Sequence, residues 1–363
     1  MKIVKDWNMH RTGIAVIGRL AQGAELLDGQ TVKTNMLYEE LRRCYPGADV
    51  RCVDVYRYKK RLPVILFQTL LAFVRCEHIF VLLSRNGRRF FFPILTALNA
   101  VFRRQLYHDV IGGALPGEAA QSPSLRRQLR RFTVNWVESA SMQNALAQIG
   151  VTNAAVLPNF KRQKILVPEE CRGGDAAPFV FVTFSRVLRE KGIPAAAEAV
   201  AAVNAAMGEG TAQLRIYGPV DEDYRAAFDA LLVQYADCVS YHGCVPPAES
   251  GAVLADAYML LFPSVYAGEG MPGTILDAYA AGLPVIATDW HCNAEFVSHG
   301  VTGWCYDPGA PQQLEEWVRY AVQHPRTVNA MRESCLAQAH RYTPEAAMRI
   351  ISEMMKLPLE KEN

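Results

Sequence analysis

Short apolar segments alternate with longer helical patterns along most of the chain, and this alternation is the strongest constraint on the fold. The first series of β-branched and aromatic segments predicts strands at 13–18, 49–56, 78–84, 104–110, 134–139 and 153–158. Helical patterns fall between them at 31–43, 62–75, 90–102, 124–132 and 141–149. Strands that alternate with helices predict a parallel sheet with right-handed crossovers.

A second series of the same kind begins at residue 179. Its predicted strands are 179–185, 212–218, 238–243, 257–264 and 283–289, with helices after Gly192, from Asp221 and after Pro272, and a short helix between 243 and 257. A chain of 363 residues is too long for one ordinary core. We therefore expect an α/β protein with two Rossmann-like, doubly wound domains and a cleft between them.

The domain boundaries follow from composition. The polar, loop-rich segment 161–177 separates the two series, which places the first domain at 1–165 and the second at 166–342. The last helical pattern, within 343–363, has no strand partner. It could pack back on the N-terminal domain.

Charge is divided unevenly between the two halves. Residues 1–165 hold 25 Lys and Arg against 11 Asp and Glu, a net of +14, whereas residues 166–363 hold 13 against 25, a net of −12. Such asymmetry suggests different partners for the two halves. The basic half suits an anionic membrane or acceptor, or is a solvated basic surface. We expect no nucleic acid partner.

Several classes are excluded or disfavoured. The nine cysteines are odd in number and show no CxxC pair, which favours a reducing compartment over a disulfide framework or a zinc site. The first 13 residues have no apolar signal core, and the longest apolar run, 62–74, is too short to cross a bilayer. We expect a cytoplasmic protein, free or peripheral at the inner face of the cytoplasmic membrane. No hydrolase or metalloprotease pattern is present in the sequence.

One candidate anion site lies in "SRVLREKG", residues 185–192. This segment connects a predicted strand to a predicted helix, and it carries Arg186 and Lys191. Two cations beside the free N–H groups of a helix start suit a diphosphate, and also a leaving group that gains negative charge. The alternative is an ordinary solvated loop.

The first domain offers two further candidates. Gly29, Gln30 and Thr31 begin the helix after the first strand, where they could face phosphates or form an ordinary capped helix start. His108 ends a predicted strand and could bond a sugar hydroxyl, although a structural histidine is the more frequent case in general.

Other motifs are less specific. Two predicted strands end in glycine, at Gly218 and at Gly243, which follows His242. The missing side chain would permit close approach of a ring or a sugar. A tight turn that requires glycine is the alternative. Asp221 and Asp223 begin a helix, so capping explains them better than a metal. We expect no metal and no other cofactor.

Two apolar segments of the first half are flanked by arginines. Residues 62–76 and 88–104 are predicted to be core helices by default. Their Arg-flanked ends, together with the basic helix at 124–132, leave interfacial docking open.

The segment "GEGMPGTILDAYAAGLPV", residues 268–285, places Glu269 in a Gly/Pro loop and Asp277 eight positions later. With the Arg186/Lys191 segment, the "YG" and "HGCV" strand ends and "HGVTGW", it resembles the retaining glycosyltransferases of family 4 (group 1) in order and spacing. The resemblance covers most of residues 179–305. In the N-terminal half, "DGQTVKTNMLYEEL", "LYHDVIGG" and "VLPNF" are similar to bacterial surface-polysaccharide members.

The resemblance implies a GT-B fold and a role for each matching residue. Glu269 and Asp277 match the E-x7-E motif, with Glu269 on the donor sugar and Asp277 on the ribose of the nucleotide. Arg186, Lys191 and Thr274 would hold the diphosphate, and His108 would approach the donor sugar. The loop residues that would present backbone N–H groups to the sugar are Gly270, Met271, Pro272 and Gly273. Two departures from the family pattern are Asp277 for Glu and Ser185 for Gly.

These observations together predict a retaining, metal-independent glycosyltransferase of the hexosyltransferase class. It would move a sugar from a nucleoside-diphosphate sugar to a glycan or lipid-linked acceptor in lipopolysaccharide or capsule synthesis. Two other classes stay open: a sugar-nucleotide epimerase on a related fold, and a non-catalytic protein that binds nucleotide sugars.

Overall fold

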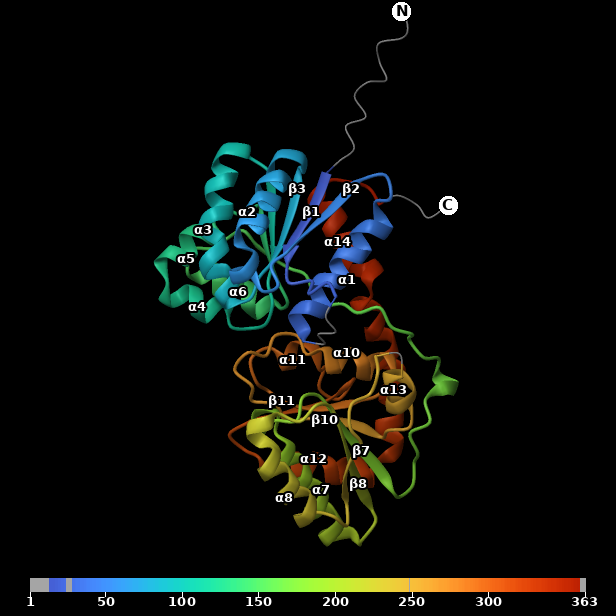
Figure 1. The fold of residues 1–363 in the computed structure, drawn as a ribbon. Coiled ribbons are helices and arrows are strands. Elements are labelled where there is room, and N and C mark those ends of the chain that lie inside the picture. The colour runs from blue at the N-terminus through green and yellow to red at the C-terminus, as the bar shows by residue number, and fades with distance from the viewer. Residues whose placement is uncertain (1–12, 24–27, 248, 360–363) are drawn as a thin grey trace, which may run out of the picture. The chain divides into compact units, whose positions relative to one another are not determined.

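A computed structural model describes residues 13–23, 28–247 and 249–359 and divides the chain into two compact units. The first unit comprises residues up to Phe160 together with the segment from Pro344, and the second runs from Lys161 to Thr343 (Figure 1). The division falls five residues before the boundary expected from composition. The prediction that the N-terminus has no apolar signal core concerns residues 1–12, which lie outside the described residues.

The first unit is built on a six-stranded parallel sheet with strand order β2-β1-β3-β4-β5-β6. Its strands are β1 (Gly13–Gly18), β2 (Asp49–Asp54), β3 (His78–Leu82), β4 (Gln105–Asp109), β5 (Val134–Val137) and β6 (Ala154–Val156). Its helices are α1 (Gly29–Cys44), α2 (Tyr58–Arg75), α3 (Arg85–Phe102), α4 (Leu115–Gln121), α5 (Pro123–Leu129), α6 (Ala140–Gln148) and α14 (Pro344–Met355).

Helices cover both faces of this sheet (Figure 1). One face packs against α2, α3, α4 and α6, and the other against α1 and α14. On the second face, three rings stack across neighbouring strands, with centroids 4.9 Å apart for Phe80 and Tyr107 and 5.2 Å for Tyr107 and Trp136. Buried aromatic ladders of this kind fix strand register as well as burying area.

The last helix of the chain is part of the first unit. Met348 and Ile351 of α14 are fully buried in the core that α1 shares. Arg43 of α1 forms an ion pair of 3.0 Å with Glu345, and the Tyr45 hydroxyl donates to the Leu357 carbonyl at 3.2 Å. The chain thus returns to its first sheet after completing the second unit.

The second unit is also built on a six-stranded parallel sheet, with order β12-β11-β10-β7-β8-β9. Its strands are β7 (Phe179–Phe184), β8 (Ala212–Tyr217), β9 (Val239–Tyr241), β10 (Met259–Phe262), β11 (Val285–Thr288) and β12 (Gly303–Tyr306). Its α-helices are α7 (Ile193–Met207), α8 (Arg225–Gln234), α9 (Ser250–Ala255), α10 (Gly273–Ala280), α11 (Asn293–Phe296), α12 (Gln312–Gln323) and α13 (Pro325–Ala339). Single 3-10 turns are η1 (Pro168–Glu170), η2 (Arg189–Lys191), η3 (Glu222–Tyr224) and η4 (His340–Tyr342).

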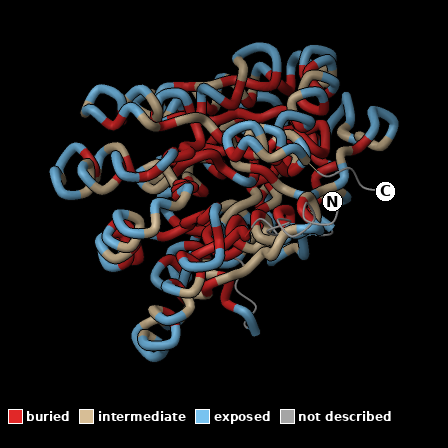
Figure 2. The backbone as a smooth tube through the Cα atoms, turned by 90° about the horizontal axis from the view of Figure 1, so that it is seen from above, coloured by how far each residue is buried: buried red, intermediate tan, exposed pale blue. Residues whose placement is uncertain are grey.

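Here too helices lie on both faces of the sheet. Helices α7, α8 and α12 share one core with the strands, and α9, α10, α11 and part of α13 share the other. Buried residues are concentrated in the strands and exposed ones on the outer sides of helices and in loops (Figure 2). The doubly wound α/β architecture predicted from the sequence is therefore confirmed in both units.

The differences from the sequence-based elements are local. Helices α2 and α3 begin four or five residues earlier than predicted, and α5 ends at Leu129. Five elements were not predicted from the sequence: α4, α11, β12, α12 and α13. Helix α12 nevertheless has a helical pattern in its buried residues Leu314, Val318 and Ala321. Among the described residues, no helix is both long enough and apolar enough to cross a bilayer.

His108 is the predicted site residue whose surroundings differ most from expectation. Its ring is fully buried between Phe92 and Phe132, with centroid distances of 4.9 and 5.4 Å. Nδ1 lies 3.0 Å from the Asn135 side-chain oxygen, and Nε2 has no hydrogen-bond partner among the described residues. The expected contact with a sugar is corrected accordingly: in this unit His108 is a core residue on the α3 side of β4.

The buried His108 predicts a measurable pH dependence of stability. Burial, with Arg88 and Lys33 nearby, lowers its pKa to about 3, so the ring stays neutral in the folded chain and protonates in the unfolded chain near pH 6.5. The free energy of unfolding should therefore fall as the pH decreases from 6.5. The loss due to this histidine should reach about 1.5 kcal/mol at pH 5. Urea unfolding of His108→Leu should lack that part of the slope. An equal slope in the variant would contradict the assignment.

Candidate active site

The second unit changes winding direction between β7 and β10. Read from β9, its strand order is 3-2-1-4-5-6, so the chain winds one way from β7 to β9 and the other way from β10 to β12. In such sheets ligands bind beyond the carboxyl ends of the strands at this switch point. The segments that follow β7 and β10 carry Arg186, Lys191 and Glu269.

Lys191 and Glu269 meet there as a buried ion pair. Lys191 Nζ lies 2.5 Å from Glu269 Oε2, and the two residues are only 9 % and 8 % exposed. The Ser264 hydroxyl donates to the same carboxylate oxygen at 2.8 Å. Removing one partner of such a pair leaves an uncompensated buried charge. The structure thus brings together two of the predicted residues, which are 78 positions apart in the sequence.

An aromatic ring holds the two predicted cations side by side. Lys191 Nζ lies 5.1 Å from the centre of the Tyr266 ring, and the Arg186 guanidinium lies 5.6 Å from it. Arg186 is exposed, whereas Lys191 is buried. The Tyr266 backbone is fixed by the Trp290 indole, which donates to its carbonyl at 3.1 Å. One cation therefore faces solvent and the other supports the carboxylate.

The glycine-rich loop leads directly into α10. Cys292 Sγ donates to the Gly270 carbonyl at 3.3 Å, which ties this loop to the segment after β11. Pro272 is the N-cap of α10 and offers no side-chain acceptor, so no side chain caps the first N–H groups of the helix. Because proline has no N–H, Pro272 itself cannot donate to a sugar, contrary to the initial expectation. The Thr274 hydroxyl is buried and has no hydrogen-bond partner among the described residues.

Asp277 lies on α10 and is paired differently from Glu269. Its carboxylate lies 2.5 Å from Lys161 Nζ. Burial raises its pKa, and Lys161 opposes that rise. Asp277 lines a cavity of about 510 Å³ in the second unit, together with Gln163 and Ser250. The contact with a ribose stays a prediction.

The protein backbone requires glycine more strictly at position 218 than at position 243. Gly218 has φ +131°, and a Cβ there would lie 1.9 Å from the Ser185 carbonyl oxygen, so the protein backbone itself explains this glycine. Gly243 has φ +75°, but a Cβ there would meet no atom of the described residues within 4 Å, and its carbonyl accepts from Gly218 N–H at 2.8 Å. His242 is exposed, and Nε2 lies 2.8 Å from the Ser240 hydroxyl.

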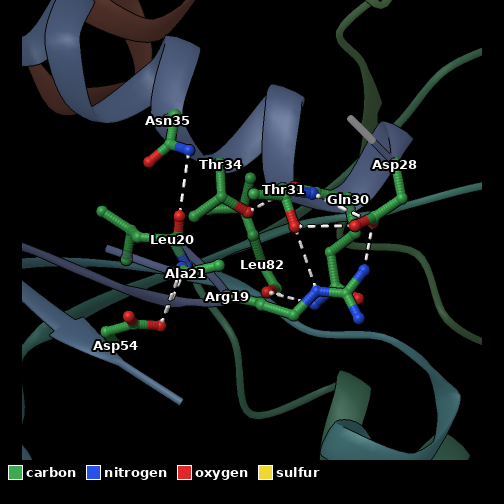
Figure 3. Close-up of polar contacts among 10 residues, drawn as sticks. All are labelled: Arg19, Leu20, Ala21, Asp28, Gln30, Thr31, Thr34, Asn35, Asp54 and Leu82. Carbon is green, nitrogen blue, oxygen red and sulfur yellow. Dashed lines mark hydrogen bonds and ion pairs between the residues drawn. The ribbon is translucent and has the colours of Figure 1, made fainter. Parts of the chain in front are cut away.

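The first unit has its own switch point, between β1 and β3 (Figure 3). There the Asp28 carboxylate caps α1 by accepting from Thr31 N–H at 3.3 Å and from the Thr31 hydroxyl at 2.9 Å. Arg19 forms an ion pair with Asp28 and donates to the Thr31 hydroxyl at 3.1 Å. Gln30 is buried, and its amide lies 3.4 Å from the Leu82 carbonyl. A carboxylate therefore already occupies the helix start at which Gly29 and Thr31 were expected to face phosphate.

A cavity of about 410 Å³ opens at the same strand ends. It is lined by residues that follow β1, β2 and β3: Arg19, Gln30, Val55, Tyr56, Arg57, Tyr58, Lys59, Lys60, Leu83, Ser84, Asn86, Gly87 and Phe91. Its lining is mostly apolar, and four of its residues are basic: Arg19, Arg57, Lys59 and Lys60. Arg57 has φ +50°, a conformation that non-glycine residues seldom adopt.

Deeper in the first unit, Lys33 of α1 joins two carboxylates. Its Nζ lies 2.8 Å from Asp109 Oδ1 and 2.9 Å from Glu138 Oε1, and it donates to the Val110 carbonyl at 2.8 Å. All three side chains are buried. This group ties α1 to the ends of β4 and β5.

Sequence reasoning missed Ser264, Tyr266 and Lys161 as parts of these sites. Ser264 and Tyr266 follow a strand in a loop that it had already placed next to Glu269, so their position was available from the sequence. The Lys161–Asp277 contact joins residues 116 positions apart and had no local signature. Asp221 accepts from Asp223 N–H at 3.2 Å, as expected for a cap. In the described part of the chain, no cluster of three or more His, Cys, Asp or Glu side chains is arranged to hold a metal.

Residues 178–324 match the family model described as "Glycosyl transferases group 1". Over 142 residues the chain is 30 % identical to the amylovoran biosynthesis glycosyltransferase AmsK of Erwinia amylovora, and over 144 residues it is 30 % identical to the putative colanic acid biosynthesis glycosyltransferase WcaL of Salmonella typhimurium. Each match covers 38 % of this chain and 34 % of the relative, so the chain matches about a third of the length of these relatives. The predicted resemblance to group 1 enzymes of bacterial polysaccharide synthesis is confirmed.

Solved structures match nearly the whole chain. The crystal structure of Anabaena Alr3699/HepE in complex with UDP and glucose has a TM-score of 0.73 at 17 % identity and covers 95 % of this chain and 100 % of its own. The lipopolysaccharide outer core galactosyltransferase WaaB has a TM-score of 0.69 at 14 % identity, with 95 % and 99 % covered. The fold is GT-B. Each of the two units described above, with its six-stranded sheet and surrounding helices, corresponds to one of the two Rossmann-like domains of this fold.

The geometry at Gly218 predicts a graded effect of substitution. In Gly218→Ala the new methyl group would meet the Ser185 carbonyl at a φ that alanine disfavours, so the free energy of unfolding should fall by at least about 2 kcal/mol. Gly243→Ala is the matched control, because its φ is also positive but its surroundings are open, and it should cost about 1 kcal/mol. Urea unfolding measures both. Equal losses would show that the Ser185 contact has no effect.

Proposed function

We propose that this protein is a retaining glycosyltransferase that moves a sugar from a nucleoside-diphosphate sugar to a hydroxyl of a glycan or lipid-linked acceptor in bacterial surface-polysaccharide synthesis. The observation that carries the proposal is the buried Lys191–Glu269 pair at the switch point, beside the exposed Arg186. The match of residues 178–324 to group 1 glycosyl transferases supports it. So does the complex of Anabaena Alr3699/HepE with UDP-glucose, a structural neighbour.

In this proposal the second unit binds the donor. Arg186 and Lys191 hold the diphosphate, because both cations gather on Tyr266 at the carboxyl end of β7. Thr274 adds a buried hydroxyl that has no protein partner among the described residues, and the uncapped start of α10 adds backbone N–H groups. Glu269 accepts from hydroxyls of the donor sugar. Its other contacts, Lys191 and Ser264, fix the orientation of the carboxylate.

The proposed chemistry is a front-face displacement. The bond between the anomeric carbon and the diphosphate oxygen breaks while the acceptor oxygen bonds to the same face of the sugar, so the configuration is retained. The acceptor proton passes to the departing diphosphate oxygen. Lys191 and Arg186 stabilise the negative charge that grows on the leaving group. No side chain is required as a nucleophile, and activity should persist in EDTA.

The first unit is proposed to bind the acceptor. Its 410 Å³ cavity, at the carboxyl ends of β1, β2 and β3, has a mostly apolar lining and four basic residues. Basic side chains there suit an acceptor with phosphate or carboxylate groups. Contact with the inner face of the cytoplasmic membrane also belongs to this proposal.

Three variants separate a catalytic role of the ion pair from a structural one. Lys191→Met and Glu269→Gln should each lower activity, by about 10²–10³ for the lost cation and about 10–10² for the lost carboxylate. Lys191→Met also leaves Glu269 buried and unpaired, which costs about 3–5 kcal/mol of stability. The double variant removes both charges and should recover most of this stability while activity stays lost. The assay is nucleotide release from UDP-, GDP- and ADP-sugars with lipid extracts as acceptors.

Two outcomes would contradict the proposal. The first is a double variant that regains transfer along with stability, because the pair would then be only structural. The second is an epimerised sugar formed from donor alone, which would favour the epimerase. Product analysis of the anomeric carbon by NMR tests retention in the same reaction.

A further inference from the structure

Helix α2 is apolar on the side that faces solvent. Between Leu62 and Val74 it contains no charged residue. Ile65, Thr69, Ala72 and Phe73 are buried against the sheet, as the core requires. The large apolar residues exposed on α2 are Val64, Phe67, Leu70 and Val74, with Phe67 66 % exposed.

The exposed residues lie on one face. Positions 64, 67, 70 and 74 are three or four apart, so they fall on the same side of a helix with 3.6 residues per turn. The buried positions lie on the opposite side. A helix that is apolar on both sides normally has a partner on both. In the described unit, only the inner side has one.

The end of α3 adds an exposed apolar residue close to the end of α2. Helices α2 and α3 run side by side (Figure 1), with ring contacts of 5.5 Å between Tyr58 and Phe90 and 6.1 Å between Phe73 and Phe102. Val101, at the end of α3, is 76 % exposed. Arg104, just beyond it, donates to the Val74 carbonyl at 3.1 Å. We call the exposed residues Val64, Phe67, Leu70, Val74 and Val101 the α2 face.

Positive charge surrounds the α2 face. Residues 55–104 contain ten Lys and Arg and a single acid, Glu77. Lys59, Lys60 and Arg61 are exposed at the start of α2. Arg75 and Arg103 are exposed at the ends of α2 and α3. The face is therefore an apolar strip between two groups of cations.

We propose that the α2 face is a docking surface for an anionic lipid bilayer. The apolar run from Leu62 to Val74 is about 20 Å long, shorter than the roughly 30 Å hydrocarbon core, so the helix lies in the plane of the interface. Lipid tails cover the apolar side chains, and the flanking cations meet the negative headgroups. A second copy of this chain fits less well, because two identical faces would bring their cations together.

This surface deepens the proposed function, because it places the enzyme where a lipid-linked acceptor lies. It rests on residues of the first unit that are separate from Lys191 and Glu269. A failure of docking would therefore leave transfer to a water-soluble acceptor intact. A failure of the glycosyltransferase proposal would leave docking intact.

The test is flotation of the full-length chain with vesicles. The wild type should float with vesicles of phosphatidylethanolamine and phosphatidylglycerol, weakly with phosphatidylcholine alone, and less as salt rises. Phe67→Asp should weaken binding by about tenfold to a hundredfold. Val74→Asp, at the other end of the face, should act in the same direction.

The matched control is Val233→Asp on α8, because Val233 is 81 % exposed but lies in the second unit. It should bind vesicles like the wild type. All three variants should unfold at nearly the wild-type temperature, since each site is exposed. Wild-type chain that stays with the aqueous fraction, or Phe67→Asp that floats like Val233→Asp, would overturn the proposal. So would a dimer of the wild type that Phe67→Asp dissociates without any change in flotation.

Discussion

The buried ion pair between Lys191 and Glu269 is the interaction on which the candidate active site depends. It joins the segment after β7 to the segment after β10, the two strands between which the second sheet changes winding direction. Burying both charges is costly unless they remain paired and hydrogen-bonded, and Ser264 completes the set. The pair therefore fixes the glycine-rich loop relative to β7. It also holds the Glu269 carboxylate in one orientation, which the proposed contact with a donor sugar requires.

The two units share one arrangement of the sheet but differ in the charged residues around it. Each presents its polar residues at the carboxyl ends of parallel strands, around a switch point. In the second unit two cations share the Tyr266 ring. In the first, Arg19 is neutralised by Asp28, and further cations lie around the cavity and α2. The positive charge of the first half is thus concentrated in part around this cavity and α2, whereas the second half is acidic overall and keeps two cations together at Tyr266.

The sequence predicted the fold well because parallel strands buried on both faces are short apolar runs with helices between them. It predicted the Glu269 and Lys191 segments because both follow such strands. It could not predict which face of β4 His108 occupies, since Leu106 and Tyr107 before it are equally buried. The Lys161–Asp277 ion pair also could not be predicted, because the two residues are 116 positions apart and no local sequence pattern connects them. Strand β12 was not predicted although β10 and β11 are equally short; it begins with Gly303, a residue type that is depleted in strands.

The most direct test of the account is equilibrium titration of the chain with UDP, GDP and ADP, comparing Arg186→Ala with Arg189→Ala. Both arginines are exposed in the same loop, but Arg186 lies over Tyr266 at the switch point and Arg189 lies over Tyr224. The account predicts that the wild type binds one of these diphosphates, that Arg186→Ala binds it at least about tenfold more weakly, and that Arg189→Ala is unchanged. Equal affinity in the two variants, or no binding of any of the three by the wild type, would contradict it.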